Sequence, residues 1–202
     1  NNMQIKKILI LALFINSINS FAFASFEAEE KFVSEFADNA ISILSSENLD
    51  SSQKNIQFTE LVLSSIDLNL ISKFVLSKYW KTATDDQKNS YLVAFKQYFI
   101  SSYANKLDQY SGEKVVIVSS NAAKKFVIVK SNIVRDGTDT LKIELDWRLL
   151  SRDGQTKIID LSIEGISLII AQREEFQSFL SNNEGNIDAL IEKINSINTK
   201  SN

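Results

Sequence analysis

Hydrophobic and polar residues alternate in the second half of the chain with the period of a β-strand. From Thr140 to Leu150 apolar side chains occupy every second position and charged side chains fill most positions between them, the pattern of a strand with one wet face. The apolar positions are Leu141, Ile143, Leu145, Trp147 and Leu149. Ile159, Leu161 and Ile163 repeat the alternation, and residues 125–134 are apolar on both faces. The pattern predicts four strands between residues 113 and 163.

Short turn sequences between these strands predict an antiparallel meander. Asp136-Gly137 and Asp153-Gly154 are pairs that accept positive φ and suit tight hairpin turns. Residues 119–123 supply a third, less specific, turn.

Helical periodicity precedes the strands. Residues 26–44 form an amphipathic pattern, a second helix is expected around residues 56–63, and Asp67 suits the N-cap of a third. Thr84 and Gln87 fit a capping box at the start of a long helix over residues 85–110.

Two more helices are expected after the sheet, over residues 168–180 and 187–194. The polar tail at residues 195–202 is expected to be disordered. The fold class is therefore α+β, with residues 25–194 as one domain.

Aromatic residues form a stripe along the long helix. Its rings include Tyr91, Phe95, Tyr98, Phe99 and Tyr103. They either fill the space between helix and sheet as ordinary core or line a cavity with apolar contents. We interpret the domain as a container.

The first 24 residues have the pattern of a secretory signal. Lys6-Lys7 precede an apolar run, and residues 22–24, Ala-Phe-Ala, form an A-x-A site before Ser25. The apolar run is far shorter than the roughly 20 residues of a spanning helix. We expect cleavage after Ala24 and an exported protein.

The composition excludes several kinds of covalent link, catalytic site and metal site. Among 202 residues there is no histidine and no cysteine, and the net charge is −3. The missing residues exclude disulfides, most nucleophile-and-base arrangements and the usual zinc sites. Lys124-Lys125 is the only basic pair after the signal, so we expect a solvated turn there and no nucleic-acid partner.

Two stretches carry more than a periodic pattern. One runs from Val75 through the Lys78-Tyr79-Trp80 segment and the aromatic helix to Tyr110. The other is residues 160–168, with the sequence DLSIEGISL. Together they resemble the MlaC family of periplasmic phospholipid-binding proteins, and the second is similar to the family signature D-x-x-x-E-G-[VI]-S. The chain departs from the family where Ser77 replaces a frequent glycine, where Thr156 replaces a tryptophan, and where Gln172-Arg173 replaces Tyr-Arg.

The resemblance implies a curved four-stranded antiparallel sheet with helices enclosing a deep apolar pocket, similar to NTF2-like or cystatin-like domains. It also implies a periplasmic carrier that moves diacyl phospholipid between an outer-membrane lipoprotein complex and an inner-membrane ABC transporter complex with its lipid-binding ring, maintaining outer-membrane asymmetry. We expect a monomer that is not an enzyme, with phospholipid as ligand and neither cofactor nor metal.

Candidates for the pocket wall come from the helices and from the apolar face of the sheet, and each could equally be ordinary core. They are Trp80, Phe95, Phe99, Tyr103, Ile143, Leu145, Trp147, Ile159, Leu161, Ile163 and Ile166. The resemblance itself places Tyr103 and Ile166 at the pocket. We expect a uniformly apolar wall, because an unpaired polar group facing a lipid tail costs about 1–3 kcal/mol.

Two other classes of function remain open. An NTF2-like enzyme would pair Asp146 or Asp160 with Tyr103 for proton transfer, which needs a carboxylate directed into the cavity. The alternation predicts that both aspartates lie on the face opposite Ile159, Leu161 and Ile163. An adaptor domain would have a solid core and no cavity.

Overall fold

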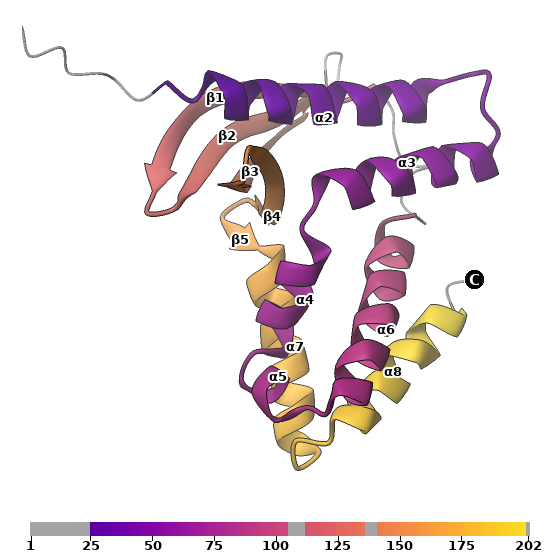
Figure 1. Ribbon diagram of the computed structural model, residues 1–202. Coiled ribbons are helices and arrows are strands. Elements are labelled where there is room, and N and C mark those ends of the chain that lie inside the picture. The colour runs from indigo at the N-terminus through magenta and orange to yellow at the C-terminus, as the bar shows by residue number, and fades with distance from the viewer. Residues whose placement is uncertain (1–24, 105–111, 136–140, 201–202) are drawn as a thin grey trace, which may run out of the picture.

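The computed structural model describes residues 25–104, 112–135 and 141–200. In this part of the chain, seven helices and one five-stranded sheet form an α+β fold (Figure 1). The helices are α2 (Glu27–Ser45), α3 (Ser51–Ser65), α4 (Leu68–Leu76), α5 (Lys78–Thr82), α6 (Asp85–Ala104), α7 (Leu168–Asn182) and α8 (Ile187–Lys200). The strands are β1 (Lys114–Ala123), β2 (Phe126–Arg135), β3 (Leu141–Arg152), β4 (Gln155–Ile163) and β5 (Ile166–Ser167).

The sheet is an antiparallel meander in the order β1-β2-β3-β4-β5. The four expected strands are present, and the two-residue β5 adds a fifth, which pairs with the end of β4. The register shifts between Ile117 and Ser119 in β1 and beside Arg148 and Leu149 in the β3–β4 pair. Such bulges bend and twist a sheet, and Figure 1 shows the curved course of β1 and β2.

The structure describes two of the three positions where the sequence predicts a hairpin turn, and it has a turn at one of these two. Asp153 and Gly154 have φ of 51° and 75° and join β3 to β4 as predicted. The turn predicted at residues 119–123 is wrong, because these residues pair with β2 up to Ala123 and the chain reverses at Lys124-Lys125. Residues 136–137, the other predicted turn, lie outside the described part of the chain.

Side-chain caps define the starts of several helices. Thr84 and Gln87 form the predicted capping box, with Thr84 N donating to Gln87 Oε1 at 3.0 Å and Gln87 N donating to Thr84 Oγ1 at 3.2 Å. Asp67 accepts from Leu70 N at 2.9 Å and caps α4, also as predicted.

A capping box that the sequence analysis missed begins α3. Asp50 accepts from the backbone N–H of Gln53, and the Gln53 side chain accepts from the backbone N–H of Asp50. The D-x-x-Q spacing at residues 50–53 is the sequence signal for it.

The C-terminal tail differs from the prediction. Helix α8 does not end at Ile194 but continues to Lys200, so the disorder predicted from Asn195 is wrong for residues 195–200. Ile194 is fully buried, and Asn198 is buried with its Nδ2 donating to Ala94 O of α6 at 3.1 Å. These contacts with α6 hold the last two turns in the helix.

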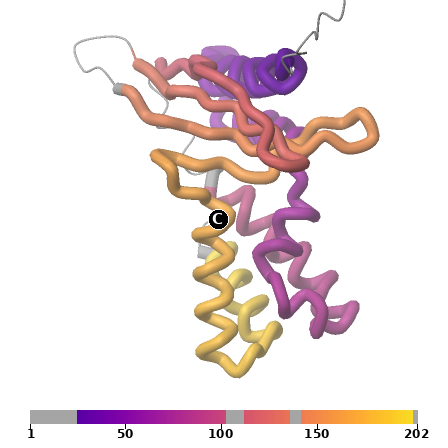
Figure 2. The backbone as a smooth tube through the Cα atoms, turned by 90° about the vertical axis from the view of Figure 1, so that its left-hand side faces the viewer, coloured from indigo at the N-terminus to yellow at the C-terminus, as the bar shows by residue number. Residues whose placement is uncertain are grey.

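The helices form two groups around the sheet. Figures 1 and 2 show α2 running along the sheet and the group α4 to α8 extending away from its β4–β5 edge. Trp147 of β3 packs edge-on against Phe36 of α2 with ring centroids 5.6 Å apart, and its Nε1 donates to Ser131 Oγ at 2.9 Å. One continuous core cluster joins the sheet to both groups of helices.

The described helices include none that combines the length and the apolar character needed to cross a bilayer.

Candidate functional site

A β-bulge in β4 changes which residues face the helices. Arg148 of β3 pairs with Asp160 and Leu149 pairs with Ile158, so Ile159 is the extra residue. Both Ile159 and Asp160 line one pocket together with Arg148. The predicted separation of Asp160 from Ile159 onto opposite faces is therefore wrong, because a bulge breaks the two-residue period.

This pocket has a volume of about 280 Å³ and lies between β2, β3 and β4 on one side and α4 and α7 on the other. Most of its wall is apolar. Its lining residues are Leu70, Ile71, Phe74, Lys125, Phe126, Arg148, Ile159, Asp160, Ile169 and Ile170.

Two smaller, largely apolar cavities are linked to the pocket through shared wall residues. The first, of about 20 Å³, shares Ile71, Asp160 and Ile169 with the pocket and also touches Phe99. The second, of about 10 Å³, shares Phe99 with the first and is otherwise lined mainly by α3. We call these three spaces the cavity row; it leads from the pocket to the Phe99 ring.

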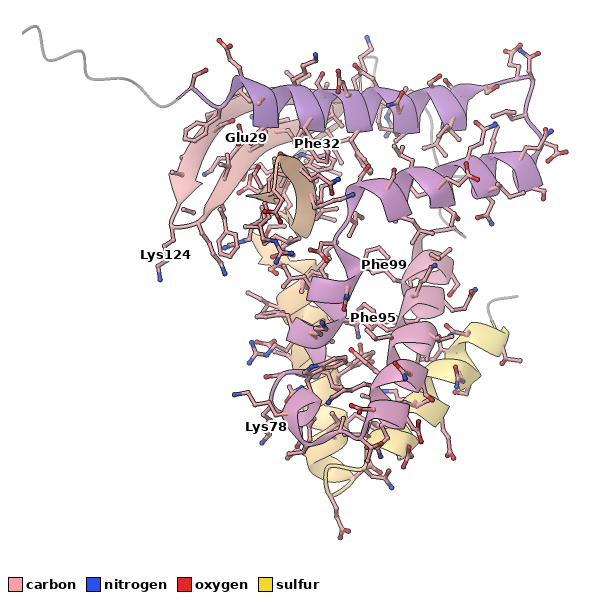
Figure 3. The ribbon with its side chains drawn as sticks, in the orientation of Figure 1. Glu29, Phe32, Lys78, Phe95, Phe99 and Lys124 are labelled. Carbon is pink, nitrogen blue, oxygen red and sulfur yellow. The ribbon has the colours of Figure 1, made fainter. Side chains whose placement is uncertain are left out.

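The Phe99 side chain belongs to the walls of both smaller cavities. It comes from α6, is 9% exposed and packs on Phe95 with ring centroids 6.3 Å apart. Figure 3 shows Phe95 and Phe99 on the side of α6 that faces α4. Cavities of 10–20 Å³ hold about one water molecule each, whereas ligand pockets typically measure about 300–1,000 Å³.

Two cations share one aromatic ring at the pocket. Lys125 Nζ lies 5.3 Å and Arg148 Cζ lies 5.5 Å from the centroid of Phe126. A third cation, Arg173, stacks on Phe74 at 4.6 Å and donates from Nη2 to Ser77 Oγ at 2.8 Å. The expectation of a uniformly apolar wall is therefore wrong for this pocket.

Asp160 is buried and fully engaged in holding the chain. Ser167 Oγ donates to its Oδ2 at 2.5 Å, and Ile169 N donates to its Oδ1 at 3.3 Å. Ser167 Oγ also accepts from Ile170 N at 3.0 Å and caps α7. Asp160 thus fixes the start of α7 against β4.

The rest of the D-x-x-x-E-G-x-S motif forms the turn between β4 and β5. Glu164 and Gly165 have φ of 49° and 79°, which a two-residue hairpin turn requires. Glu164 Oε1 accepts from the backbone N–H of Glu144 on β3 at 2.6 Å. The four motif residues therefore act together to turn the chain from the sheet into α7.

A larger, more open groove of about 760 Å³ lies between the α3–α4 junction, α6 and the end of the β3–β4 hairpin. Its wall includes five charged residues, among them Lys96, Lys157 and the ion pair of Arg152 with Asp67, whose atoms are 2.8 Å apart. Charged walls suit an aqueous surface better than a lipid tail.

The predicted wall residues divide into three sets. Phe99, Ile159 and Leu161 line the cavity row. Buried in the core are Phe95, Leu145 and Trp147, of which Phe95 also borders the charged groove.

Four other candidates are not among the residues that line the cavity row. Ile163 and Ile166 pair with each other at the β4–β5 turn and are 40% and 65% exposed. Ile143 is half-buried on β3, and Trp80 packs in α5 beneath Lys73, 5.3 Å from its ring. The side chain of Tyr103 lies outside the described part of the structure.

Sequence reasoning missed most of the residues that line the cavity row. Those buried around its inner part are Ile66, Ile71, Ile158 and Ile169. Ile71 and Ile169 did carry a signal, because Ile71 shares helical spacing with Leu68 and Val75, and Ile169 with Phe176 and Leu180. Ile158 gave none, since it precedes the alternating run from which the inward face of β4 was read.

The described residues contain no group of three or more Asp, Glu, His or Cys side chains placed to hold a metal ion. Asp146 of the alternative acid–base pair lies on β3 opposite Lys130 and is not among the residues that line the cavity row.

Comparisons with family models, curated proteins and solved structures give consistent matches. The model of the family described as MlaC protein matches residues 34–196. A curated relative, the intermembrane phospholipid transport system binding protein MlaC of Haemophilus influenzae, is 25% identical over 136 residues, 66% of this chain and 63% of that protein. The matched part of the chain thus spans less than two thirds of this relative.

A solved structure has the same fold. It is the phospholipid-binding protein from Ralstonia solanacearum in complex with a phospholipid, with a TM-score of 0.73 and 21% sequence identity. The match covers 85% of this chain and 97% of that one.

Proposed function

Because the chain belongs to the MlaC protein family, we propose that it carries one diacyl phospholipid, with the acyl tails inserted along the cavity row. The observation that carries the proposal is the line of apolar spaces from the pocket at Phe126 to the ring of Phe99. The proposal is supported by the names of the two relatives, one from a phospholipid transport system and one in complex with a phospholipid.

The cavity row must widen to accept the tails. Its two inner cavities total a few tens of Å³, far below the 300–1,000 Å³ typical of ligand pockets. The walls there come from α3, α4, α6 and α7, which are separate elements packed on β4 through apolar side chains. Apolar contacts are non-directional, so α6 can move outward and exchange contacts with protein for contacts with lipid.

The energy of shielding a lipid explains why a protein is needed. Each exposed methylene costs about 0.8 kcal/mol, and two tails hold roughly 30 of them, a total on the order of 20 kcal/mol. An apolar wall offers the tails an environment close in free energy to that of a bilayer. Transfer in either direction is then nearly balanced, and the carrier itself performs no chemical reaction.

The proposed cellular role follows from the family and from the N-terminal sequence. Residues 1–24 would direct export to the periplasm, with cleavage after Ala24. There the monomeric carrier would exchange lipid with an outer-membrane lipoprotein complex and an inner-membrane ABC transporter complex. The relative's name, an intermembrane phospholipid transport system binding protein, supports this role.

Two matched isoleucine variants test the proposal. Ile169 and Ile191 are 7% and 9% exposed, but only Ile169 lines the cavity row. Ile169→Phe should fill the junction of pocket and inner cavity, whereas Ile191→Phe adds the same volume to the α8 side of the core. Overpacking costs each variant about 1–3 kcal/mol of stability.

The measurement is phospholipid per protein, by mass spectrometry of the purified proteins under native conditions. We expect about one phospholipid in the parent and in Ile191→Phe, and at least about tenfold less in Ile169→Phe, equivalent to 1.4 kcal/mol. A parent that takes up no phospholipid when mixed with vesicles would refute the carrier role. Equal lipid in both variants would place the tails elsewhere.

A further inference from the structure

The two cations at Phe126, Lys125 and Arg148, take part in none of the ion pairs of the described residues. Within the described ranges neither Lys125 nor Arg148 has an ion-pair partner within 4.0 Å, and both lie against the face of one ring. Two like charges beside one apolar ring repel each other and gain only part of their stabilisation from the ring. A ligand anion between them would relieve that repulsion.

Asp160 is the one acid among the lining residues of this pocket, and it is already occupied. Its two oxygens accept from Ser167 Oγ and from Ile169 N. On β3, Asp146 is two residues from Arg148 and faces Lys130 of β2 across the strands. Neither Asp160 nor Asp146 forms an ion pair with Lys125 or Arg148 among the described residues, so both cations remain available to a ligand anion.

The apolar part of the same pocket decides what kind of anion fits. Phe74 and Ile170, 42% and 47% exposed, border the pocket beside the cations. Ile71 and Ile169 line both this pocket and the first inner cavity. A ligand that satisfies both features has a negatively charged phosphate at one end and hydrocarbon at the other. An arginine can bind a phosphate through two parallel hydrogen bonds, and a lysine adds a point charge.

We infer that this protein selects phospholipids with a net negative head group, such as phosphatidylglycerol, through Lys125 and Arg148 at the mouth of the cavity row. This inference rests on the proposed function, because it requires that the tails lie along the same cavities. A zwitterionic head group such as phosphatidylethanolamine carries an ammonium group that the two cations repel. The preference is electrostatic and weakens as salt is raised.

A competition between two lipids tests the inference. The full exported chain, stripped of lipid, is mixed with vesicles of equal parts phosphatidylglycerol and phosphatidylethanolamine with identical acyl chains, and the bound lipids are counted by mass spectrometry. The test variant is Lys125→Gln/Arg148→Gln. The control, Lys130→Gln/Lys142→Gln, removes the same charge from exposed lysines of β2 and β3 that do not line the pocket.

We expect the parent and the control to bind phosphatidylglycerol with about tenfold preference, equivalent to 1.4 kcal/mol, and the test variant to bind both lipids about equally. A parent without preference, or a test variant that keeps it, overturns the inference while the carrier role stands. A parent that binds neither lipid refutes the carrier role itself. If inorganic phosphate in tenfold excess over lipid abolishes the preference while sodium chloride of the same ionic strength does not, the cations bind free phosphate and the inference is wrong.

Discussion

The Ser167 hydroxyl donates a 2.5 Å hydrogen bond to the carboxylate of Asp160, across the turn that joins β4 to α7. The same hydroxyl oxygen accepts from Ile170 N, so one side chain links the strand to the first turn of the helix. This link sets the position of Ile169 and Ile170, which form part of the wall of the pocket.

Removing that hydroxyl should destabilise the domain. Ser167→Ala loses both the N-cap of α7 and the bond to Asp160, and it leaves a buried carboxylate oxygen without its donor. We expect the free energy of unfolding to fall by about 1–3 kcal/mol in urea titrations. Ser196→Ala is the control, because its exposed hydroxyl bonds only within α8. Equal losses in the two variants would contradict the linking role.

Phe99→Ala should join the two inner cavities, and bound lipid should then stabilise the variant by occupying the enlarged space. Without lipid, the truncation should cost about 3–5 kcal/mol. With bound phospholipid, part of that loss should be recovered because the tails occupy the new space. The measurement is urea unfolding of stripped and lipid-loaded protein.

The control for Phe99→Ala is Phe176→Ala. Phe176 is fully buried and packs on Phe95 and Tyr98, but it does not line the cavity row. Its truncation should lower the free energy of unfolding by a similar amount. Bound lipid should stabilise Phe176→Ala no more than it stabilises the parent. Similar recovery in both variants would show that the tails do not reach Phe99.

Ser77→Gly should stabilise the chain. Ser77 has φ of 56° and ψ of −127° between α4 and α5, a conformation that costs a non-glycine residue about 1–3 kcal/mol. Glycine relieves this strain but loses the bond from Arg173. We expect a net gain of about 1 kcal/mol in thermal unfolding, and a loss of stability for Ser77→Ala, which keeps the strain and lacks the hydroxyl. A Ser77→Gly protein that melts below the parent would contradict this account.

Tyr91 should make the protein sensitive to alkali. Its ring is fully buried and its hydroxyl donates to Ser72 O at 2.9 Å. Burial raises the pKa of Tyr91 far above its ordinary value of 10.0. Ionisation of Tyr91 therefore does not lower the free energy of unfolding below pH 10, and it lowers that free energy progressively as the pH rises above 10.

We expect ultraviolet absorbance titration to show Tyr91 ionising only together with alkaline unfolding. Tyr91→Phe should unfold at a higher pH than the parent. At neutral pH it should be less stable by about 1 kcal/mol, because Ser72 O loses its donor. A parent in which every tyrosine ionises near pH 10 while still folded would refute this assignment.

Much of the local structure was predictable from the sequence. The alternation in β3, the Asp153-Gly154 turn and the caps at Asp67 and Thr84 each depend on residues a few positions apart, and the structure confirms them. The end of α8 was not predictable in this way. Asn198 is polar and favours a tail by composition, but its bond to Ala94 O depends on a helix about 100 residues earlier in the chain.

The candidate site was predicted only in part for the same reason. Phe99 and Leu161 lie on faces that periodicity identifies, and both line the cavity row. Ile159 lines it as well, but beside Asp160 and Arg148 rather than apart from them. The bulge that moves it depends on how β3 and β4 pair, which no local pattern specifies.

The sequence by itself determined the α+β class, the order of the elements, most of their boundaries and, through two motifs, the family. Only the tertiary structure decided where the apolar spaces lie and which cations stand beside them. The physical reason is that periodicity and capping act within one element, whereas a cavity exists where side chains of several elements fail to meet. Lys125, Arg148 and Phe126 come together because β2 and β3 pair in one particular register, and that register is settled by the packing of the whole sheet against its helices.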